Sequence, residues 1–546
     1  MKNILILSVI AILFFSFTNS MEKVDYLFYN GRVYSVDKDF GVYESFVIKN
    51  GKIVAVGSNK NILSKYESDN KIDLKGKFVY PGFIDAHCHF YSYGLGLKRG
   101  NLTGTKSFDE VLEKLKEHNE KFPSEWIIGR GWDQNDWKKK EFPNKEKLDN
   151  IFPDKPVFLT RIDGHAVLVN SKALNIAGIT KESKINGGFF EIKNQKLTGI
   201  LIDNAIDIVK DIIPEPELSE KITALKSAAN NCFSVGLTTV ACAGLPKEII
   251  ELYDSLQKSG ELKIRIYAML ETNEENFNRF LYKGIYKTNY LNVRSVKMYV
   301  DGALGSRGAL LFEPYSDDTE NIGLMLNDTN YYNEICNLVI KNGYQVNTHA
   351  IGDSAIRFIL NVYSKHLKGK NDLRWRIEHS QVVHPDDFKM FGKYNIIPSV
   401  QTTHATSDMY WAEERLGKKR LKGAYAYKQL MKQNGWIPNG SDFPIEDINP
   451  IYGFYAAFSR KDIKGYPENG FQKENALTRE ESLKAMTIWA AMSLFEENEK
   501  GSIETGKFAD FVILDKDIME IKESEVPFVK VLKTFIGGEE VFSVNE

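Results

Sequence analysis

One apolar run of this chain ends in two histidines: Val79-Tyr80-Pro81-Gly82-Phe83-Ile84-Asp85-Ala86-His87-Cys88-His89. Alternate side chains of a β-strand share a face, so His87 and His89 are expected to point the same way and Cys88 the opposite way. One histidine alone is more often a hydrogen-bonded structural residue than a ligand. A His-x-His pair at the end of a strand shifts the balance toward a metal site.

Seven further apolar runs follow along the chain, and four of them contain Lys297, His349, His379 and Asp442. The runs span residues 236–241, 263–270, 293–300, 344–349, 374–379, 396–401 and 435–442. Helix-like stretches separate them, which indicates parallel βα units. Ligands from several strand ends converge only if the strands close into a barrel, whose catalytic residues gather at its carboxyl rim. We therefore predict an α/β fold, a (β/α)8 TIM-like barrel over residues 80–495.

The two ends of the chain carry β-rich runs of a different kind. Residues 26–34 and 45–57 form such runs, with a tight-hairpin signal at Asn50-Gly51, and similar material returns at 501–515 and 529–541. The sequence predicts a small β-sandwich domain built from residues 21–79 and 496–546. An insertion of about residues 100–230 separates the first two barrel strands, and long insertions of this kind usually carry function.

Composition excludes several classes of protein. The 546 residues are 43% hydrophobic and 26% charged, with 71 basic and 73 acidic side chains, which is ordinary globular usage. This near neutrality gives no reason to expect a nucleic-acid partner. The four cysteines, Cys88, Cys232, Cys242 and Cys336, form no CxxC pair and no disulfide framework, so we expect buried thiols.

The N-terminus has the pattern of an export signal. Lys2 precedes an uncharged apolar run over residues 4–17 and then Thr18-Asn19-Ser20. The run is shorter than the about 20 residues that span a bilayer, so we expect residues 1–20 to be a cleaved signal peptide and the mature chain to be periplasmic or secreted, without stable membrane insertion. The alternative is that Met21 is the true start and the protein is cytoplasmic.

Four imidazoles and one carboxylate at strand ends suit zinc, with manganese, iron or nickel as alternatives. Lys297 is the least obvious member of the set. It could be an outward-facing, solvated lysine, and an ammonium group cannot bind a cation. If it is buried, its pKa falls and the neutral amine can take up carbon dioxide, giving a carbamate with two oxygens that could bridge two metals.

The motifs together resemble the amidohydrolase superfamily, and most closely its family 3 branch, which includes N-substituted formamide deformylases. The resemblance covers nearly the whole mature chain. It is carried by residues 81–89, Val296-Lys297-Met298-Tyr299-Val300-Asp301-Gly302-Ala303-Leu304-Gly305-Ser306-Arg307, Thr348-His349-Ala350-Ile351-Gly352-Asp353, Ile377-Glu378-His379 and Gly440-Ser441-Asp442-Phe443-Pro444.

The resemblance implies a role for each member of the ligand set. His87 and His89 would hold the more buried of two divalent ions, expected to be zinc, and a carboxylated Lys297 would bridge the pair. His349 and His379 would hold the second ion. Asp442 would contact metal and act as the base when a bridging hydroxide attacks the substrate, then return the proton to the leaving nitrogen.

Three further residues are candidates for contact with the substrate. His165, in Arg161-Ile162-Asp163-Gly164-His165, and His404, in Gln401-Thr402-Thr403-His404, resemble family segments at the mouth of the site and could stabilise an oxyanion. Arg307 could orient a carbonyl or a carboxylate. For each, a structural hydrogen bond is the alternative. Aromatic residues of the insertion and of 410–411 would either favour an apolar substituent on nitrogen or pack the insertion onto the barrel.

The function expected from this resemblance is hydrolysis of a non-peptide C–N bond in a small N-substituted amide or formamide-like substrate. One rival is hydrolysis of esters, lactones or phosphotriesters on the same barrel. A less favoured rival is a non-catalytic binding protein, because a fold does not fix a function. Association into a homo-oligomer is left open by the sequence.

Overall fold

A parallel sheet that is closed into a barrel forms the centre of the computed structural model, which describes residues 21–544. Its seven strands pair in the order β10 (Phe83–Cys88), β17 (Leu237–Leu245), β18 (Arg265–Leu270), β20 (Leu291–Tyr299), β21 (Gln345–Ala350), β22 (Arg376–His379) and β23 (Ile397–Ser399). A short strand, β19 (Tyr286–Lys287), pairs antiparallel with β20. The first seven predicted barrel strands are therefore confirmed within a few residues at their ends.

The eighth predicted strand, over residues 435–442, is not a regular strand. One parallel bridge joins Val400 to Asn439, and the backbone N–H of Ala86 donates to the Asn439 carbonyl oxygen at 3.2 Å on the other side. Pro438 has no N–H to donate, so a continuous ladder cannot form there. The segment still lies between β23 and β10 and closes the ring. Val400 N–H donates to the Pro438 carbonyl and Gly440 N–H to the Val400 carbonyl on one side, and Asp442 N–H donates to the His87 carbonyl on the other.

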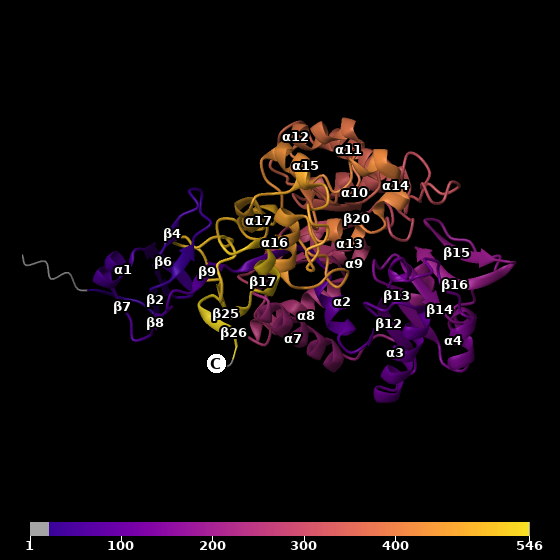
Figure 1. The fold of residues 1–546 in the computed structure, drawn as a ribbon, viewed down its shortest axis with the longest axis horizontal. Coiled ribbons are helices and arrows are strands. Elements are labelled where there is room, and N and C mark those ends of the chain that lie inside the picture. Colours follow the sequence, from indigo (N-terminus) through magenta and orange to yellow (C-terminus); the bar gives the residue numbers. More distant parts are fainter. Residues whose placement is uncertain (1–20, 545–546) are drawn as a thin grey trace, which may run out of the picture.

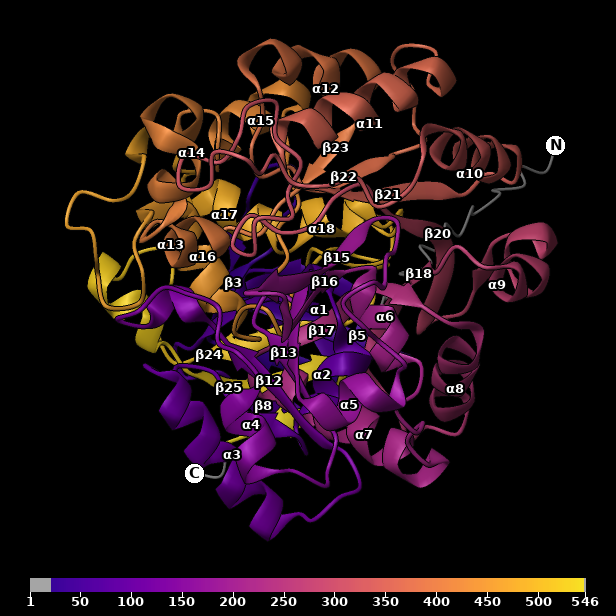
Figure 2. The same ribbon diagram turned by 90° about the vertical axis from the view of Figure 1, so that its right-hand side faces the viewer.

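Helices alternate with the barrel strands and cover the outside of the ring. They are α7 (Leu218–Ser234), α8 (Lys247–Lys258), α9 (Glu274–Arg279), α10 (Thr329–Lys341), α11 (Asp353–His366), α12 (Phe388–Tyr394) and α15 (Tyr427–Asn434). Figure 2 shows α7 to α12 following one another around the periphery. The last part of the barrel region is helical, with α16 (Pro450–Ser459), α17 (Arg479–Ala485) and α18 (Ile488–Ser493). This is the (β/α) barrel that the sequence predicts.

The insertion folds around a sheet of its own. Its strands pair in the order β11 (Gly100–Asn101), β12 (Ile127–Trp132), β13 (Val157–Arg161), β14 (Ala166–Val169), β16 (Lys196–Asp203) and β15 (Gly188–Lys193), and its helices are α3 (Phe108–Lys121), α4 (Glu146–Ile151), α5 (Ser171–Ile176) and α6 (Ala205–Lys210). Separate apolar clusters line the two faces of this sheet. Trp126, Trp132, Trp137 and Phe190 are buried in these clusters, which favours the packing interpretation for them.

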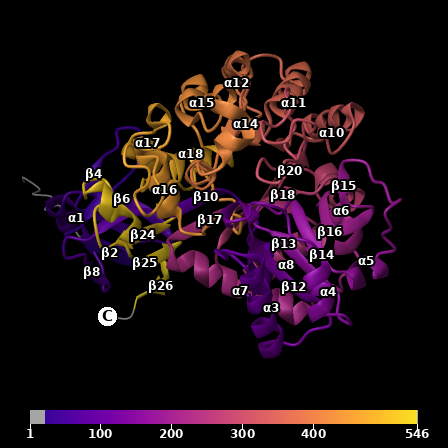
Figure 3. The ribbon, with the colours of Figure 1, turned by 45° about the vertical axis from the view of Figure 1, so that its right-hand side comes forward.

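Two mixed sheets are built from both ends of the chain. One contains β6 (Lys52–Gly57), β5 (Ser45–Lys49), β2 (Tyr26–Tyr29) and β8 (Lys71–Asp73); the other contains β26 (Glu539–Ser543), β25 (Val531–Ile536), β24 (Phe511–Leu514), β9 (Phe78–Pro81), β3 (Arg32–Tyr34) and β4 (Val42–Tyr43). Their facing side chains form one core, in which Phe511 stacks on Phe535 with ring centroids 4.3 Å apart. Figures 1 and 3 show these sheets and the insertion at opposite ends of the molecule.

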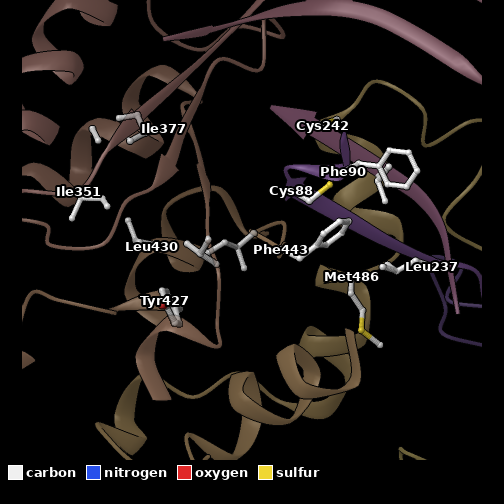
Figure 4. Close-up of a cluster of buried hydrophobic side chains, with 14 of the residues drawn as sticks. Cys88, Phe90, Leu237, Cys242, Ile351, Ile377, Tyr427, Leu430, Phe443 and Met486 are labelled. Atoms are coloured by element: carbon white, nitrogen blue, oxygen red, sulfur yellow. The ribbon is translucent and has the colours of Figure 1, made fainter. Parts of the chain in front are cut away.

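All four cysteines are buried and free, as expected. Cys88 of β10 is the register partner of Cys242 of β17, and both belong to the large apolar cluster between the barrel sheet and its helices. Figure 4 shows Cys88 close to Phe90 in this cluster. Within the described residues, no helix is both long enough and apolar enough to cross a membrane. The predicted signal peptide, residues 1–20, lies outside the described part of the chain.

Candidate metal centre

A β-bulge directs the two histidines of β10 into the barrel. Ile84 and Ala86 face the apolar interior, whereas Cys88 belongs to the outer cluster, so the alternation changes between them. The register with β17 shifts between Asp85 and Cys88, where β10 has one residue more than its partner. A bulge of this kind re-aims the following side chains. His87 and His89 therefore face the same space, with ring centroids 5.7 Å apart.

A buried charged pair holds the ring of His87. Its Nδ1 donates to Oε2 of Glu378 at 2.5 Å, and Arg376 Nε donates to Oε1 of the same carboxylate at 2.6 Å. Burial alone would raise the pKa of Glu378, but Arg376 and His87 outweigh burial and hold that pKa well below its usual range. Because the carboxylate is an acceptor only, the proton of His87 sits on Nδ1 and Nε2 offers a lone pair to the site.

His349 and His379 come from the carboxyl ends of β21 and β22, and their ring centroids lie 4.5 Å apart. Nδ1 of His379 contacts Oε1 of Gln401 at 2.7 Å, which leaves Nε2 free as a ligand atom. Nε2 of His349 lies 3.4 Å from the carbonyl oxygen of Gly302, which leaves its Nδ1. In each ring one nitrogen contacts an oxygen of the protein, and the other nitrogen is available to bind a metal.

Asp442 lies on the segment that closes the barrel, with φ of 61°. Gly440 allows this approach: a Cβ there would lie 2.5 Å from the backbone nitrogen of His87. Asp442 Oδ1 lies 3.5 Å from His87 Nε2 and 3.2 Å from His89 Nε2. Burial would raise the pKa of Asp442, but the imidazoles of His404 and His89 outweigh it and hold the pKa well below its usual range. The carboxylate is therefore anionic.

Lys297 projects from β20 into the same space and is only 2% exposed. Its Nζ lies 3.4 Å from Nε2 of His87 and 4.7 Å from the ring centroid of Tyr299. Burial lowers the pKa of Lys297 to about 8, although Glu378 and Asp442 act in the opposite direction. Lys297 therefore faces the histidines rather than solvent.

The donor set fits a divalent metal. His87, His89 and Asp442 offer ligand atoms within 4.8 Å of one another, and so do His379, His404 and Asp442. Oδ1 of Asp442 is buried, and within residues 21–544 no donor completes a hydrogen bond to it. A buried carboxylate oxygen without a partner is costly. A cation between these imidazole nitrogens and this oxygen would supply the missing interaction.

His165 reaches the site from the insertion. It follows the turn between β13 and β14, and its Nδ1 contacts Oδ1 of Asp203, at the end of β16, at 2.6 Å. Its ring centroid lies 4.9 Å from that of His349. Burial lowers the pKa of His165, but Asp203 outweighs this and raises it overall. The insertion thus contributes a histidine with its own carboxylate to the barrel mouth.

His404 begins α13 (His404–Asp408), directly after the seventh strand. Its Nδ1 contacts Oε1 of Glu446 at 2.9 Å, and its Nε2 lies 3.7 Å from Oδ2 of Asp442. Burial opposes protonation, yet Asp442 and Glu446 raise the pKa of His404 to about 10. In the protein without metal, His404 is therefore an imidazolium that can donate a hydrogen bond.

A cavity of about 600 Å³ opens over these residues. His89, His165, Lys297, His349, His379, His404 and Asp442 all line it. Trp411 also lines it, whereas Tyr410 is 54% exposed and Phe189 40% exposed. Arg307 does not line the cavity, because its guanidinium pairs with Asp317 at 2.9 Å. The structure thus supports the structural alternative for Arg307.

Sequence reasoning missed the carboxylates and amides that orient the ligands. Glu378 had a local signal, because Arg376 and Glu378 are two opposite charges on one face of a short, fully buried strand. Asp203 and Glu446 had none, since they lie 38 and 42 residues from the histidines they contact. Gln401 was quoted in a motif, but without a role.

Known proteins resemble this chain over most of its length. The sequence pattern of the amidohydrolase family matches residues 71–542. The protein LONG AFTER FAR-RED 3 of Arabidopsis thaliana is 33% identical over 539 residues, which cover 95% of this chain and 91% of that protein. An N-substituted formamide deformylase of Arthrobacter pascens is 23% identical over 540 residues, covering 94% and 97%.

A crystal structure of an uncharacterized metal-dependent hydrolase from Pyrococcus horikoshii has the same fold, with a TM-score of 0.75 and 29% identity. The matched residues make up 91% of this chain and 99% of the Pyrococcus horikoshii chain. The fold, the histidine and aspartate clusters and the family match agree with one another. The chain belongs to the amidohydrolase family, as a metal-dependent hydrolase.

Proposed function

We propose that this protein hydrolyses a non-peptide C–N bond in an N-substituted amide or formamide-like substrate. The observation that carries the proposal is the position of Asp442. Its carboxylate lies at the junction of the two ligand clusters, faces the cavity and is held anionic, so it can accept a proton there. The similarity to a protein named N-substituted formamide deformylase supports the substrate class.

In the proposed reaction, one residue of the chain transfers the proton and two others stabilise the developing negative charge. A divalent ion bound here would lower the pKa of water and polarise the substrate carbonyl. Asp442 would take the proton of the attacking water at its carboxylate and give it to the leaving nitrogen, because an amine leaves poorly unless it is protonated. His404 and His165 both line the cavity and would donate hydrogen bonds to the carbonyl oxygen as it becomes negative.

We further propose two zinc ions per chain and a carboxylated Lys297 between them. The donor set of imidazoles and carboxylate suits zinc. The supporting geometry is that Lys297 is buried beside Nε2 of His87 and lines the same cavity as His349 and His379. As a carbamate, Lys297 would turn from a cation that repels metal into an anion with two ligand oxygens.

We also propose that the protein is exported and that its mature chain begins near Met21. The proposal rests on the pattern of residues 1–20. N-terminal sequencing of protein from extracytoplasmic fractions should find the new terminus, whereas an intact Met1 in the soluble cytoplasm would contradict export.

A matched substrate panel tests the reaction. Purified protein of known metal content would be given N-substituted formamides, acetamides, the corresponding esters, lactones and a phosphotriester. The proposal expects the highest kcat/KM for an amide, in proportion to bound metal, with loss of turnover on chelation and recovery when metal is restored. Turnover that is fastest for an ester, lactone or phosphotriester would favour the rival reaction, and binding without turnover of any substrate would favour a binding protein.

A further inference from the structure

Three arginines line the cavity on the side formed by the insertion and the segment that leads into it: Arg99, Arg130 and Arg161. Arg161 is fully engaged with protein groups. Its guanidinium pairs with Asp133 and with Asp163, the latter at 2.5 Å, and its Nε donates to Oε1 of Gln134 at 2.9 Å. The charge of Arg161 is therefore balanced by carboxylates of the protein. Arg99 and Arg130 differ from Arg161 in this respect.

Arg130, on β12, lies against the turn that carries His165. Its Nη2 donates to the carbonyl oxygen of Ile162 at 2.9 Å. A Cβ on Gly164 would lie 3.6 Å from Nη2 and 3.7 Å from Nη1, so the guanidinium sits directly over this turn. Nε is buried without a hydrogen-bond partner, and within residues 21–544 no carboxylate lies within 4.0 Å of the guanidinium. Arg130 thus has one neutral hydrogen-bond partner and, within that range, no ion pair, and Asp442 and Asp163 act on its charge only from beyond 4.0 Å.

Arg99 follows α2 (Phe90–Gly96), in a turn where its backbone N–H donates to the Gly96 carbonyl oxygen at 3.0 Å. Across the described chain its guanidinium forms neither an ion pair nor a hydrogen bond, and burial lowers its pKa although Glu220 and Glu215 act in the opposite direction from a longer distance. Burial lowers the pKa of Arg130, Asp442 and Asp163 oppose this effect, and the charge of Arg99 lowers the pKa further. Two positive charges therefore face one part of the cavity.

Several of the described carboxylates that line the cavity already have partners, and none of them forms an ion pair with Arg99 or Arg130. Asp133 and Asp163 hold Arg161, Glu446 holds His404, and Asp408 accepts hydrogen bonds from Tyr425 and Gln381. A guanidinium stays protonated even when burial disfavours its charge, so loss of hydration at Arg99 and Arg130 is not relieved by deprotonation. Both side chains are only partly buried, and a partly buried charge without an ion-pair partner loses hydration that nothing fully replaces. An anionic group on a ligand would offset that loss.

We propose that Arg130 and Arg99 form a carboxylate-binding subsite, so that the substrate is an amide carrying a second, negatively charged carboxylate. The planar guanidinium fork matches a carboxylate. A phosphate dianion fits less well, because Asp133, Asp136 and Asp447 also line the cavity and would repel the higher charge. The reaction rests on the proposed function, whereas the anion subsite can be tested without turnover.

The kinetic test compares substrates that differ only at the proposed subsite. N-formyl derivatives of glycine, 4-aminobutyrate and 6-aminohexanoate are each matched with an N-formylalkylamine in which methyl replaces the carboxylate. We expect kcat/KM to favour one of the carboxylates by about 10- to 100-fold, the range for hydrogen bonds to a charged group. Arg130→Met, which removes the charge and keeps most of the volume, should abolish the preference, and Arg130→Lys should keep part of it.

Arg279→Met is the matched control. Arg279 lies on α9, pairs with Glu251 at the surface and does not line the cavity. The control should keep the full preference for the carboxylate. Equal preferences in Arg130→Met and in the parent, or an equal loss in Arg279→Met, would overturn the proposal.

A binding experiment separates the subsite from the reaction. Metal-loaded protein with Asp442→Asn, which slows turnover, would be titrated calorimetrically with 4-acetamidobutyrate and with its neutral twin N-butylacetamide. We expect at least about 10-fold tighter binding of the carboxylate, lost when Arg130→Met or Arg99→Met is added. Circular dichroism verifies the fold of each variant.

The outcomes of the two experiments are distinguishable. Arginine-dependent binding of 4-acetamidobutyrate without hydrolysis of any amide would contradict the proposed function and support the carboxylate subsite. Equal binding of the two probes, or tighter binding of 3-acetamidopropyl phosphate than of 4-acetamidobutyrate, would overturn the subsite.

Discussion

Charged side chains have different partners on two sides of the cavity. The barrel floor is the set of predicted metal ligands at the ends of the barrel strands, and the insertion-side wall is the side that carries Arg99, Arg130 and Arg161. On the floor, His87 is held by Glu378 of β22, from across the barrel sheet, and His379 by Gln401, which follows the neighbouring strand β23. On the wall, Arg161 forms ion pairs with Asp133 and Asp163, whereas Arg99 and Arg130 form no ion pair with any described residue. The difference fits the two proposals, in which the floor holds a metal and transfers protons and the wall binds a ligand carboxylate.

The largest effect on turnover is expected at the floor, from Asp442→Asn. The amide keeps the shape of the side chain and a weak ligand oxygen but cannot accept the proton. We expect kcat to fall by about 100- to 10,000-fold, the contribution of general acid–base catalysis, while metal content falls little. Steady-state kinetics with metal analysis of the same samples checks this. A parent-like kcat would show that Asp442 is at most a structural ligand and would move the search for the base to His165 and His404.

His165→Asn tests whether the wall takes part in catalysis. Loss of one hydrogen-bond donor to the developing oxyanion is expected to lower kcat by about 100-fold, with metal content unchanged, because the ring donates from the insertion. His118→Asn is the matched control, since His118 lies on α3 and does not line the cavity. If His165→Asn lost metal instead, the division between floor and wall would be wrong.

A smaller effect is expected from Glu378→Gln, which keeps the size of the side chain but removes the charge that fixes His87. Such outer partners of metal ligands typically contribute about 10- to 100-fold in metal affinity. Glu497→Gln is the control, because Glu497 pairs with Arg374, before the first residue of β22, and does not line the cavity. Competition with a chelator of known affinity measures the change. Equal metal affinities for the two variants would show that Glu378 does not contribute to metal binding.

The sequence predicted the barrel because its pattern is local: apolar runs end in polar side chains, and helical stretches separate them. The hairpin at Asn50-Gly51 was predictable for the same reason, and both residues have the positive φ angles, 52° and 73°, that such a turn requires. The irregular segment at Pro438 was not predicted, because an apolar run alone does not reveal where a missing N–H interrupts a ladder.

The ligand set was predictable for the same reason, whereas its surroundings were not. His87, His89, Lys297, His349 and His379 lie at or near the ends of barrel strands, so strand order brings them together. The environment of Arg130 depends on a turn 32 residues later in the chain, at Ile162. For Arg307 the sequence left a substrate contact and a structural role open, and the pair with Asp317 favours the structural role. Contacts between loops leave no periodic trace in the sequence.

The central claim is that the barrel floor holds divalent metal through the six predicted ligands. X-ray diffraction of metal-loaded crystals at the zinc absorption edge tests it directly. We predict two anomalous peaks, with histidine nitrogens at about 2.0–2.1 Å: one beside His87 and His89, the other beside His349 and His379. Density extending from Lys297 Nζ toward both peaks would complete the prediction. A bare Lys297 ammonium with anomalous peaks only at surface carboxylates would contradict it.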